Sequence, residues 1–108
     1  MPAEKTPVVL NLGAVLNVER AVALRDDIAA AMNGDDIVDI SFSAVEELDL
    51  SCLQVLFAAL AYAKVSGKEL RFVGALSRRV SERLKACGFL GQGLDQAADL
   101  ETALGLLS

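Results

Sequence analysis

The sequence contains no histidine, and this absence removes most of the common catalytic and metal-binding arrangements. A serine or cysteine nucleophile lacks an imidazole base, and a zinc site built from cysteine and histidine cannot form. The two cysteines, Cys52 and Cys87, belong to no metal-binding or redox spacing. The glycine-containing segment GFLGQG (88–93) is not followed by the Lys-Ser/Thr pair of a phosphate loop. We therefore expect no metal, no cofactor and no catalytic residue, and we predict that the protein is not an enzyme.

Basic and aromatic residues are also scarce. Lys and Arg number 10 against 15 Asp and Glu, which gives a formal net charge of -5. The basic residues form no cluster, so we expect no nucleic-acid partner. Tryptophan is absent and aromatic residues make up 5% of the chain, whereas hydrophobic residues make up 54%. The core must therefore consist mainly of Ala, Val and Leu.

The sequence lacks a long apolar run and a secretory leader. Its most apolar stretch, 48–65, contains Asp49 and Lys64. The uninterrupted apolar part is only about ten residues, whereas a membrane-spanning helix needs roughly 20. The N-terminal segment MPAEKTP shows no basic region followed by an apolar one. We expect a cytoplasmic protein without direct membrane insertion.

Strand and helix patterns alternate along the chain. Such alternation implies parallel strands joined by right-handed crossovers, with helices packed against the sheet. We predict one α/β domain over residues 1–108, with a mixed, mostly parallel sheet of four to five strands and about four helices; the sheet is mixed if the first two strands form a hairpin. The expected strands are 7–12, 14–16, 37–42 and 69–73, with a weak one near 88–91, and the expected helices are 18–32, 51–66, 77–86 and a last one from 95 or 99 to 107.

Asp39 lies inside IVDISF (37–42), a strand predicted to be covered on both faces. An unpaired buried charge costs several kcal/mol, so this carboxylate must find donors or lie near the end of the sheet. Two interpretations stay open. The carboxylate is held by nearby loop amides, or it has a functional role.

Ser51 follows a cluster of acids in EELDLSCLQVL (46–56). Ser51 and Gln54 have the spacing of a capping box. In such a box the serine hydroxyl accepts a hydrogen bond from the backbone amide of the glutamine, and the glutamine side chain reaches back to the backbone amide of the serine. Leu50 and Val55 are placed to form a hydrophobic staple around it. We expect this box to stabilise the helix by about 1 kcal/mol.

The helix that begins at Ser51 is nearly uncharged all round. A helix at the protein surface normally has a charged outer face, so either more of the domain or a partner protein covers this one. The side chains expected to face the sheet are Leu53, Leu56, Phe57, Leu60 and Ala63, and the opposite line is Gln54, Ala58, Ala61 and Val65.

The order of these segments resembles the STAS family, which contains anti-sigma factor antagonists and domains of sulfate transporters. The resemblance covers residues 8–106. It rests on a Val-Asp-Ile-Ser strand, Leu-Asp-Leu-Ser at a helix start, the segment SGKELRFVG, and a Ser-Arg-Arg-Val helix that ends in Cys-Gly-Phe.

The resemblance implies a phosphorylation site. The family signature is an acid, two hydroxyl residues and a glycine, and a histidine-kinase-like serine kinase phosphorylates the second hydroxyl. Asp49 and Ser51 match the acid and the phosphorylated position, whereas Leu50 and Cys52 replace the other hydroxyl residue and the glycine. The expected partner is that kinase or an anti-sigma factor, with a phosphatase as a further candidate, and phosphorylation of Ser51 is expected to end binding. The residues expected to bind the partner are Glu47, Asp49, Leu50, Ser51, Cys52, Gln54, Val55, Ala58 and Ala61.

Three other interpretations stay open. The domain could be a constitutive, unphosphorylated STAS adaptor of a transporter ATPase or a chemotaxis-type signalling complex. It could also be a small enzyme or ligand-binding domain that uses Asp39 and Asp49 around a strand-end pocket. Finally, Cys52 at a helix start suggests a redox role, against the simpler interpretation that a small residue fills the glycine position. We expect Cys87 to lie in the core.

Overall fold

The computed structural model describes residues 8–86 and 96–105. The order of its elements confirms the predicted α/β class with about four helices. The elements are β1 (Val8–Asn11), β2 (Val15–Leu16), the 3-10 helix η1 (Val18–Arg20), α1 (Ala21–Gly34), β3 (Ile37–Ser41), β4 (Glu47–Leu48), α2 (Leu50–Ser66), β5 (Glu69–Val73), α3 (Arg78–Ala86) and α4 (Ala97–Gly105). The weak strand predicted near 88–91 and Cys87 lie outside the described residues.

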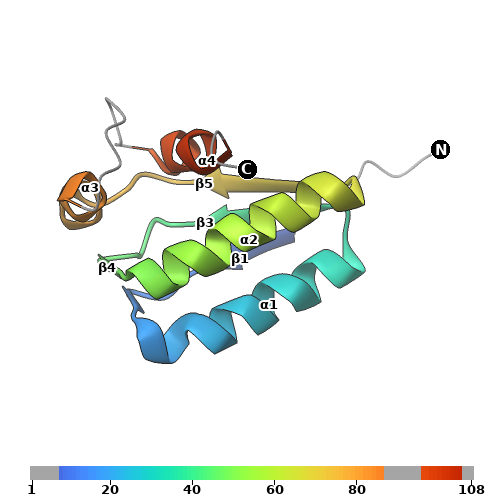
Figure 1. The fold of residues 1–108 in the computed structure, drawn as a ribbon, viewed down its shortest axis with the longest axis horizontal. Helices are drawn as coiled ribbons and strands as arrows, with labels where there is room; N and C mark the ends of the chain where they lie inside the picture. The colour runs from blue at the N-terminus through green and yellow to red at the C-terminus, as the bar shows by residue number, and fades with distance from the viewer. Residues whose placement is uncertain (1–7, 87–95, 106–108) are drawn as a thin grey trace.

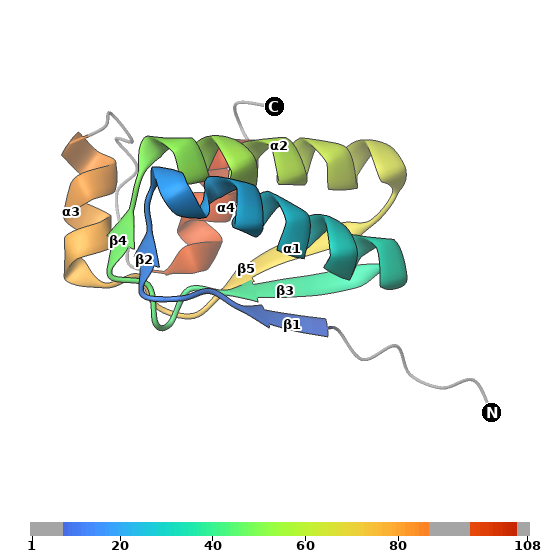
Figure 2. The same ribbon diagram turned by 90° about the horizontal axis from the view of Figure 1, so that it is seen from below.

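The five described strands form two parallel sheets. Strands β1, β3 and β5 of the larger sheet lie side by side in Figure 1. The larger sheet has the order β1-β3-β5, and the smaller one pairs β2 with β4. The predicted strands 7–12 and 14–16 do not form a hairpin, because β1 pairs with β3 while β2 pairs with β4. The mostly parallel arrangement is therefore confirmed, without the hairpin on which a mixed sheet depended, and the strands divide into two sheets. The chain bends at Ala14, and β2 turns away from the direction of β1 before it pairs with β4 (Figure 2).

Helices α1 and α2 cover one face of the larger sheet (Figure 2). Along each strand, alternate side chains point to this covered face, as the pleat of a strand requires. The buried residues of α1 and α2 recur at helical spacing and meet the strand residues in one core. The strand residues in this core are Leu10, Val38, Ile40, Leu70 and Phe72, and the helix residues include Leu24, Ile28, Met32, Leu53, Leu56 and Ala63. Within the described parts of the chain, no helix is long and apolar enough to cross a membrane.

The other face of the larger sheet explains Asp39. No described helix lies over this face, so the prediction that β3 is covered on both faces was wrong. Asp39 lies opposite Arg71 of β5, and the guanidinium donates from Nε to Oδ1 at 2.6 Å and from Nη2 to Oδ2 at 3.0 Å. This hydrogen bond raises the pKa of Arg71 further above its usual value. The carboxylate is therefore held by the neighbouring strand rather than by loop amides.

Helix α4 closes the β5 edge of the sheet. The Phe72 amide, on the side of β5 away from β3, donates to Oε1 of Glu101 at 2.7 Å. The Ala97 amide donates to the Gly74 carbonyl at 2.9 Å, and Ala75 and Gln96 form an antiparallel bridge. The Glu101 carboxylate thus takes the place of a neighbouring strand at this edge.

We predict that Glu101→Ala lowers the free energy of unfolding by about 1–3 kcal/mol, because the Phe72 amide loses an acceptor in a partly buried place. Glu101→Gln keeps a neutral acceptor and should cost clearly less. Urea unfolding with an unchanged m value measures both differences. Equal losses for the two variants would mean that the amide bond does not stabilise the edge.

Candidate site at the start of α2

Helix α2 begins at a residue fixed by the small sheet. The Asp49 amide donates to the Leu16 carbonyl at 2.8 Å, and this bond continues the β2–β4 ladder. Asp49 is extended, with φ -85° and ψ 159°, and its carbonyl accepts from the amides of Cys52 and Leu53. Asp49 is therefore the N-cap, although its side chain makes no capping hydrogen bond.

The predicted capping box is therefore wrong. Ser51 lies inside the first turn of α2, where its own backbone is helical, so its hydroxyl cannot reach the third amide of the helix as an N-cap does. The hydrophobic staple therefore involves other residues than Leu50 and Val55. With Asp49 as the N-cap, the residue before the cap is Leu48 and the fourth residue after it is Leu53. Both are buried in the core.

The hydroxyl of Ser51 has no hydrogen-bond partner among the described residues, although its Oγ is buried. The Ser77 hydroxyl behaves differently at the start of α3, where it accepts from the Val80 amide at 3.1 Å as an ordinary N-cap. The two serines have similar sequence settings, but only Ser77 serves as a cap.

Cys52 points into the core and has no exposed surface. Its thiol donates to the Asn17 carbonyl at 3.2 Å. Burial raises the pKa of the Cys52 thiol, and the nearby Asp49 charge adds to this, while the Arg20 charge opposes it. Cys52 is therefore not part of the surface available to a partner, contrary to the prediction, and the protonated thiol argues against the redox interpretation.

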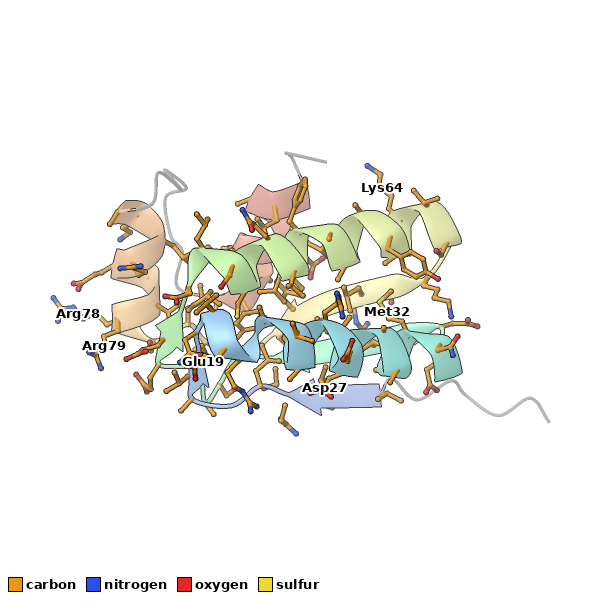
Figure 3. The ribbon with its side chains drawn as sticks, turned by 60° about the horizontal axis from the view of Figure 1, so that its bottom comes forward. Glu19, Asp27, Met32, Lys64, Arg78 and Arg79 are labelled. Carbon is orange, nitrogen blue, oxygen red and sulfur yellow. The ribbon has the colours of Figure 1, made fainter. Side chains whose placement is uncertain are left out.

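The outer face of α2 is exposed and uncharged. Leu50 is 56% exposed and Val65 is 89% exposed, while Gln54 and Ala58 between them are also exposed and Ala61 is half-buried. Lys64 is the only charged residue of the helix, and Figure 3 shows it on the side away from α1. The sequence left open whether more of the domain or a partner protein covers this uncharged face. The described part of the domain does not cover these exposed residues.

An apolar groove of about 650 Å³ runs between α1 and α2. Small side chains such as Ala29, Ala58 and Ala59 leave this space open, and Met32 lies between the two helices (Figure 3). Ser51 and Val55 line the groove from α2, together with Gln54 and Tyr62. Ser51 thus belongs to the groove wall rather than to the acidic cluster that precedes it in sequence.

The acidic cluster lies on the other side of the start of α2. Glu46, Glu47 and Asp49 line a polar pocket of about 340 Å³ together with Arg79 and Arg83 of α3. Arg83 Nη2 lies 3.8 Å from Asp49 Oδ1. The arginines balance part of the negative charge that the sequence suggests for this surface.

The structure brings most of the predicted site residues together. Leu50, Gln54, Val55, Ala58 and Ala61 share one side of α2, whereas Asp49 and Glu47 face α3. Sequence reasoning missed Arg25 and Tyr62 on the groove and Arg79 and Arg83 on the pocket. The spacing of Arg79 and Arg83 on one helix face was the only available signal. Asp39 lies on the outer sheet face, away from Asp49, and within the described ranges no group of His, Cys, Asp and Glu residues could hold a metal ion.

We predict that Ser51→Ala leaves the free energy of unfolding unchanged or raises it, because the substitution removes a buried hydroxyl without a partner. Ser77→Ala should instead lower it by about 1 kcal/mol, since it removes a formed cap. Chemical denaturation of both variants compares the two hydroxyls directly. A loss of similar size at both positions would show that Ser51 is also a cap.

We predict that Cys52 resists thiol reagents in the folded protein at neutral pH. The raised pKa keeps the Cys52 thiol protonated in the folded protein. Because this pKa is higher in the folded than in the unfolded state, the thiol contributes stability that is present below the ordinary thiol pKa of 9.0 and is lost as the pH rises above it. Labelling kinetics in a Cys87→Ser background measure the reactivity, and unfolding from pH 8 to 10 compares the slope with that of Cys52→Ala. Rapid native labelling, or identical slopes, would contradict the burial effect.

A family model described as "Mlab, STAS domain" matches residues 2–98. No significant match to a curated protein was found.

Proposed function

The chain belongs to the STAS domain family, and on this basis we propose that it is a non-enzymatic cytoplasmic domain that binds a regulatory protein through the start and outer face of α2. Family membership supports a general role in signalling or anti-sigma factor antagonism. The proposed partner is an anti-sigma factor or a histidine-kinase-like serine kinase. Phosphorylation of Ser51 is proposed to end binding.

One observation carries the proposal: the uncharged strip along α2 is exposed, and Ser51 lies at its first turn. Exposed apolar side chains on a helix surface are a common basis for protein association. The strip adjoins the α1/α2 groove, so a partner that covers Leu50, Ala58 and Val65 can also fill the groove. Such contacts would bury apolar area without removing charged groups from water.

A phosphate on Ser51 would oppose this contact. It would add about -1.5 to -2 charges at the edge of an apolar surface. The positive end of the α2 dipole lies at the same turn and would favour the phosphate, so the domain need not unfold. A partner seated on α2 would have to remove this charge from water, which weakens its binding.

Phosphorylation requires a change in the Ser51 side chain, because its Oγ is buried in the structure. Serine side chains occupy three staggered rotamers, and rotation about χ1 can turn the hydroxyl outwards without moving the helix. We propose that this rotation precedes phosphorylation, with Leu50 and Cys52 on either side of the serine.

The buried Oγ also favours a second candidate function. A domain whose serine stays turned inwards would act as a constitutive adaptor, bound to a transporter ATPase or a chemotaxis-type signalling complex through the same face of α2. The two candidates share the binding surface and differ in the effect of charge at Ser51.

We predict that a cognate serine kinase with ATP modifies Ser51, as seen by mass spectrometry of peptides. Ser66→Ala, at the other end of α2, serves as the matched control and should keep the modification, whereas Ser51→Ala should lose it. Absence of modification in the wild-type protein, together with normal binding by Ser51→Asp, would rule out the switch and favour the constitutive adaptor.

We predict that Ala58→Arg weakens partner binding by about tenfold or more, since it places a charge in the middle of an apolar contact. Ala23→Arg, an exposed position on α1 that does not line the groove, is the control and should bind normally. Isothermal titration calorimetry with the same partner measures both affinities. Equal affinities for the two variants would place the interface elsewhere.

A further inference from the structure

Strand β1 forms an edge of the larger sheet that no described residue covers. Its only neighbour is β3, in the order β1-β3-β5. The opposite edge differs, because Glu101 of α4 accepts from the outward Phe72 amide of β5 and Gln96 forms a bridge with Ala75 just after the strand. The fold therefore closes one edge of this sheet and leaves the other open within the described residues.

The backbone groups at this edge can be assigned from the ladder. In a parallel pair, the amide and carbonyl of one residue point to the same side, and successive residues alternate. The Leu12 amide donates to the Ser41 carbonyl of β3, so Leu10 also points to β3, whereas Val9 and Asn11 point away. Val9 and Asn11 thus present two amides and two carbonyls outwards, and the Val9 side chain is 53% exposed.

Strand β1 itself contains no charged residue and no proline that would prevent pairing with another strand. Natural edges are usually protected by lysine, proline, a bulge or an inward charge. Strand β1 reads Val-Val-Leu-Asn and is uncharged. The nearest charges on the open face, Asp39 and Arg71, already neutralise each other one and two strands away.

We infer that β1 pairs antiparallel with β1 of a second copy, which joins the two sheets into one of six strands. A two-fold axis through Leu10 sets Val9 of each copy opposite Asn11 of the other. Both residues point outwards, so all four outward groups of each strand find partners in this register. An axis through Val9 would instead set Asn11 against position 7, a proline without an amide hydrogen. The outward groups of β1 therefore complement those of a second copy in the register centred on Leu10.

Sedimentation equilibrium over a range of concentrations tests the inference on the full chain. Val9→Pro removes an outward amide that β3 does not use, and Val9→Thr keeps the amide and the β-branched shape. The wild type and Val9→Thr should dimerise as concentration rises. Val9→Pro should weaken the dimer by roughly tenfold or more, because two symmetry-related hydrogen bonds are lost. A wild type that stays monomeric, or equal association of both variants, would overturn the inference.

A cross-link tests the register without relying on the proline variant. Opposite residues at the two-fold axis form a non-hydrogen-bonded pair with Cα atoms about 4.5 Å apart, which suits a disulfide. In a Cys87→Ser background, Leu10→Cys should form a covalent dimer under mild oxidation, whereas Val18→Cys, which is more exposed, should not. Equal cross-linking at both positions, or none at Leu10→Cys, would contradict the proposed pairing.

Discussion

The hydrogen bond from the Asp49 amide to the Leu16 carbonyl determines how the start of α2 is built. It holds Asp49 extended at the end of the small sheet, so the helix begins at Leu50. From this start, helical geometry turns Cys52 inwards and sets Ser51 in the groove wall. Leu48 and Leu53 then pack on either side of the first turn. The chemistry available at this place therefore follows from a two-residue strand pair.

The distribution of charge in the molecule also follows from its layers. Helix α2 packs against the sheet on one side and against α1 and α4 on its flanks, so charged residues are excluded from most of its surface. The remaining strip, which faces solvent, is uncharged as well. The open face of the larger sheet, by contrast, carries the Asp39–Arg71 ion pair. Packing explains why the open sheet face carries charges and why the buried part of α2 does not. It does not explain why the exposed outer strip of α2 is uncharged, and such a strip is a favourable surface for a protein partner.

The sequence predicted the order of the large elements, because their apolar residues recur at strand or helix spacing and glycines such as Gly67 end them. It could not predict the split into two sheets, since β2 and β4 are only two residues long and owe their pairing to the fold. The Asp39–Arg71 pair was missed for the same reason: the residues meet only through the register of β3 and β5. At the site, the spacing of Ser51 and Gln54 suggested a cap, but a spacing pattern carries no information on the residue at which the backbone becomes helical. Asp49 fixes that residue through a tertiary contact.

The most direct test of the proposed binding surface is a chemical-shift map of the ¹⁵N-labelled protein during titration with a candidate partner, a histidine-kinase-like serine kinase or a transporter ATPase. We expect the largest changes at Leu50, Gln54 and Ala58 and along the α1 side of the groove, around Ala29 and Met32. Changes confined to α4 or to the open face of the larger sheet, with the α2 signals unmoved, would contradict it.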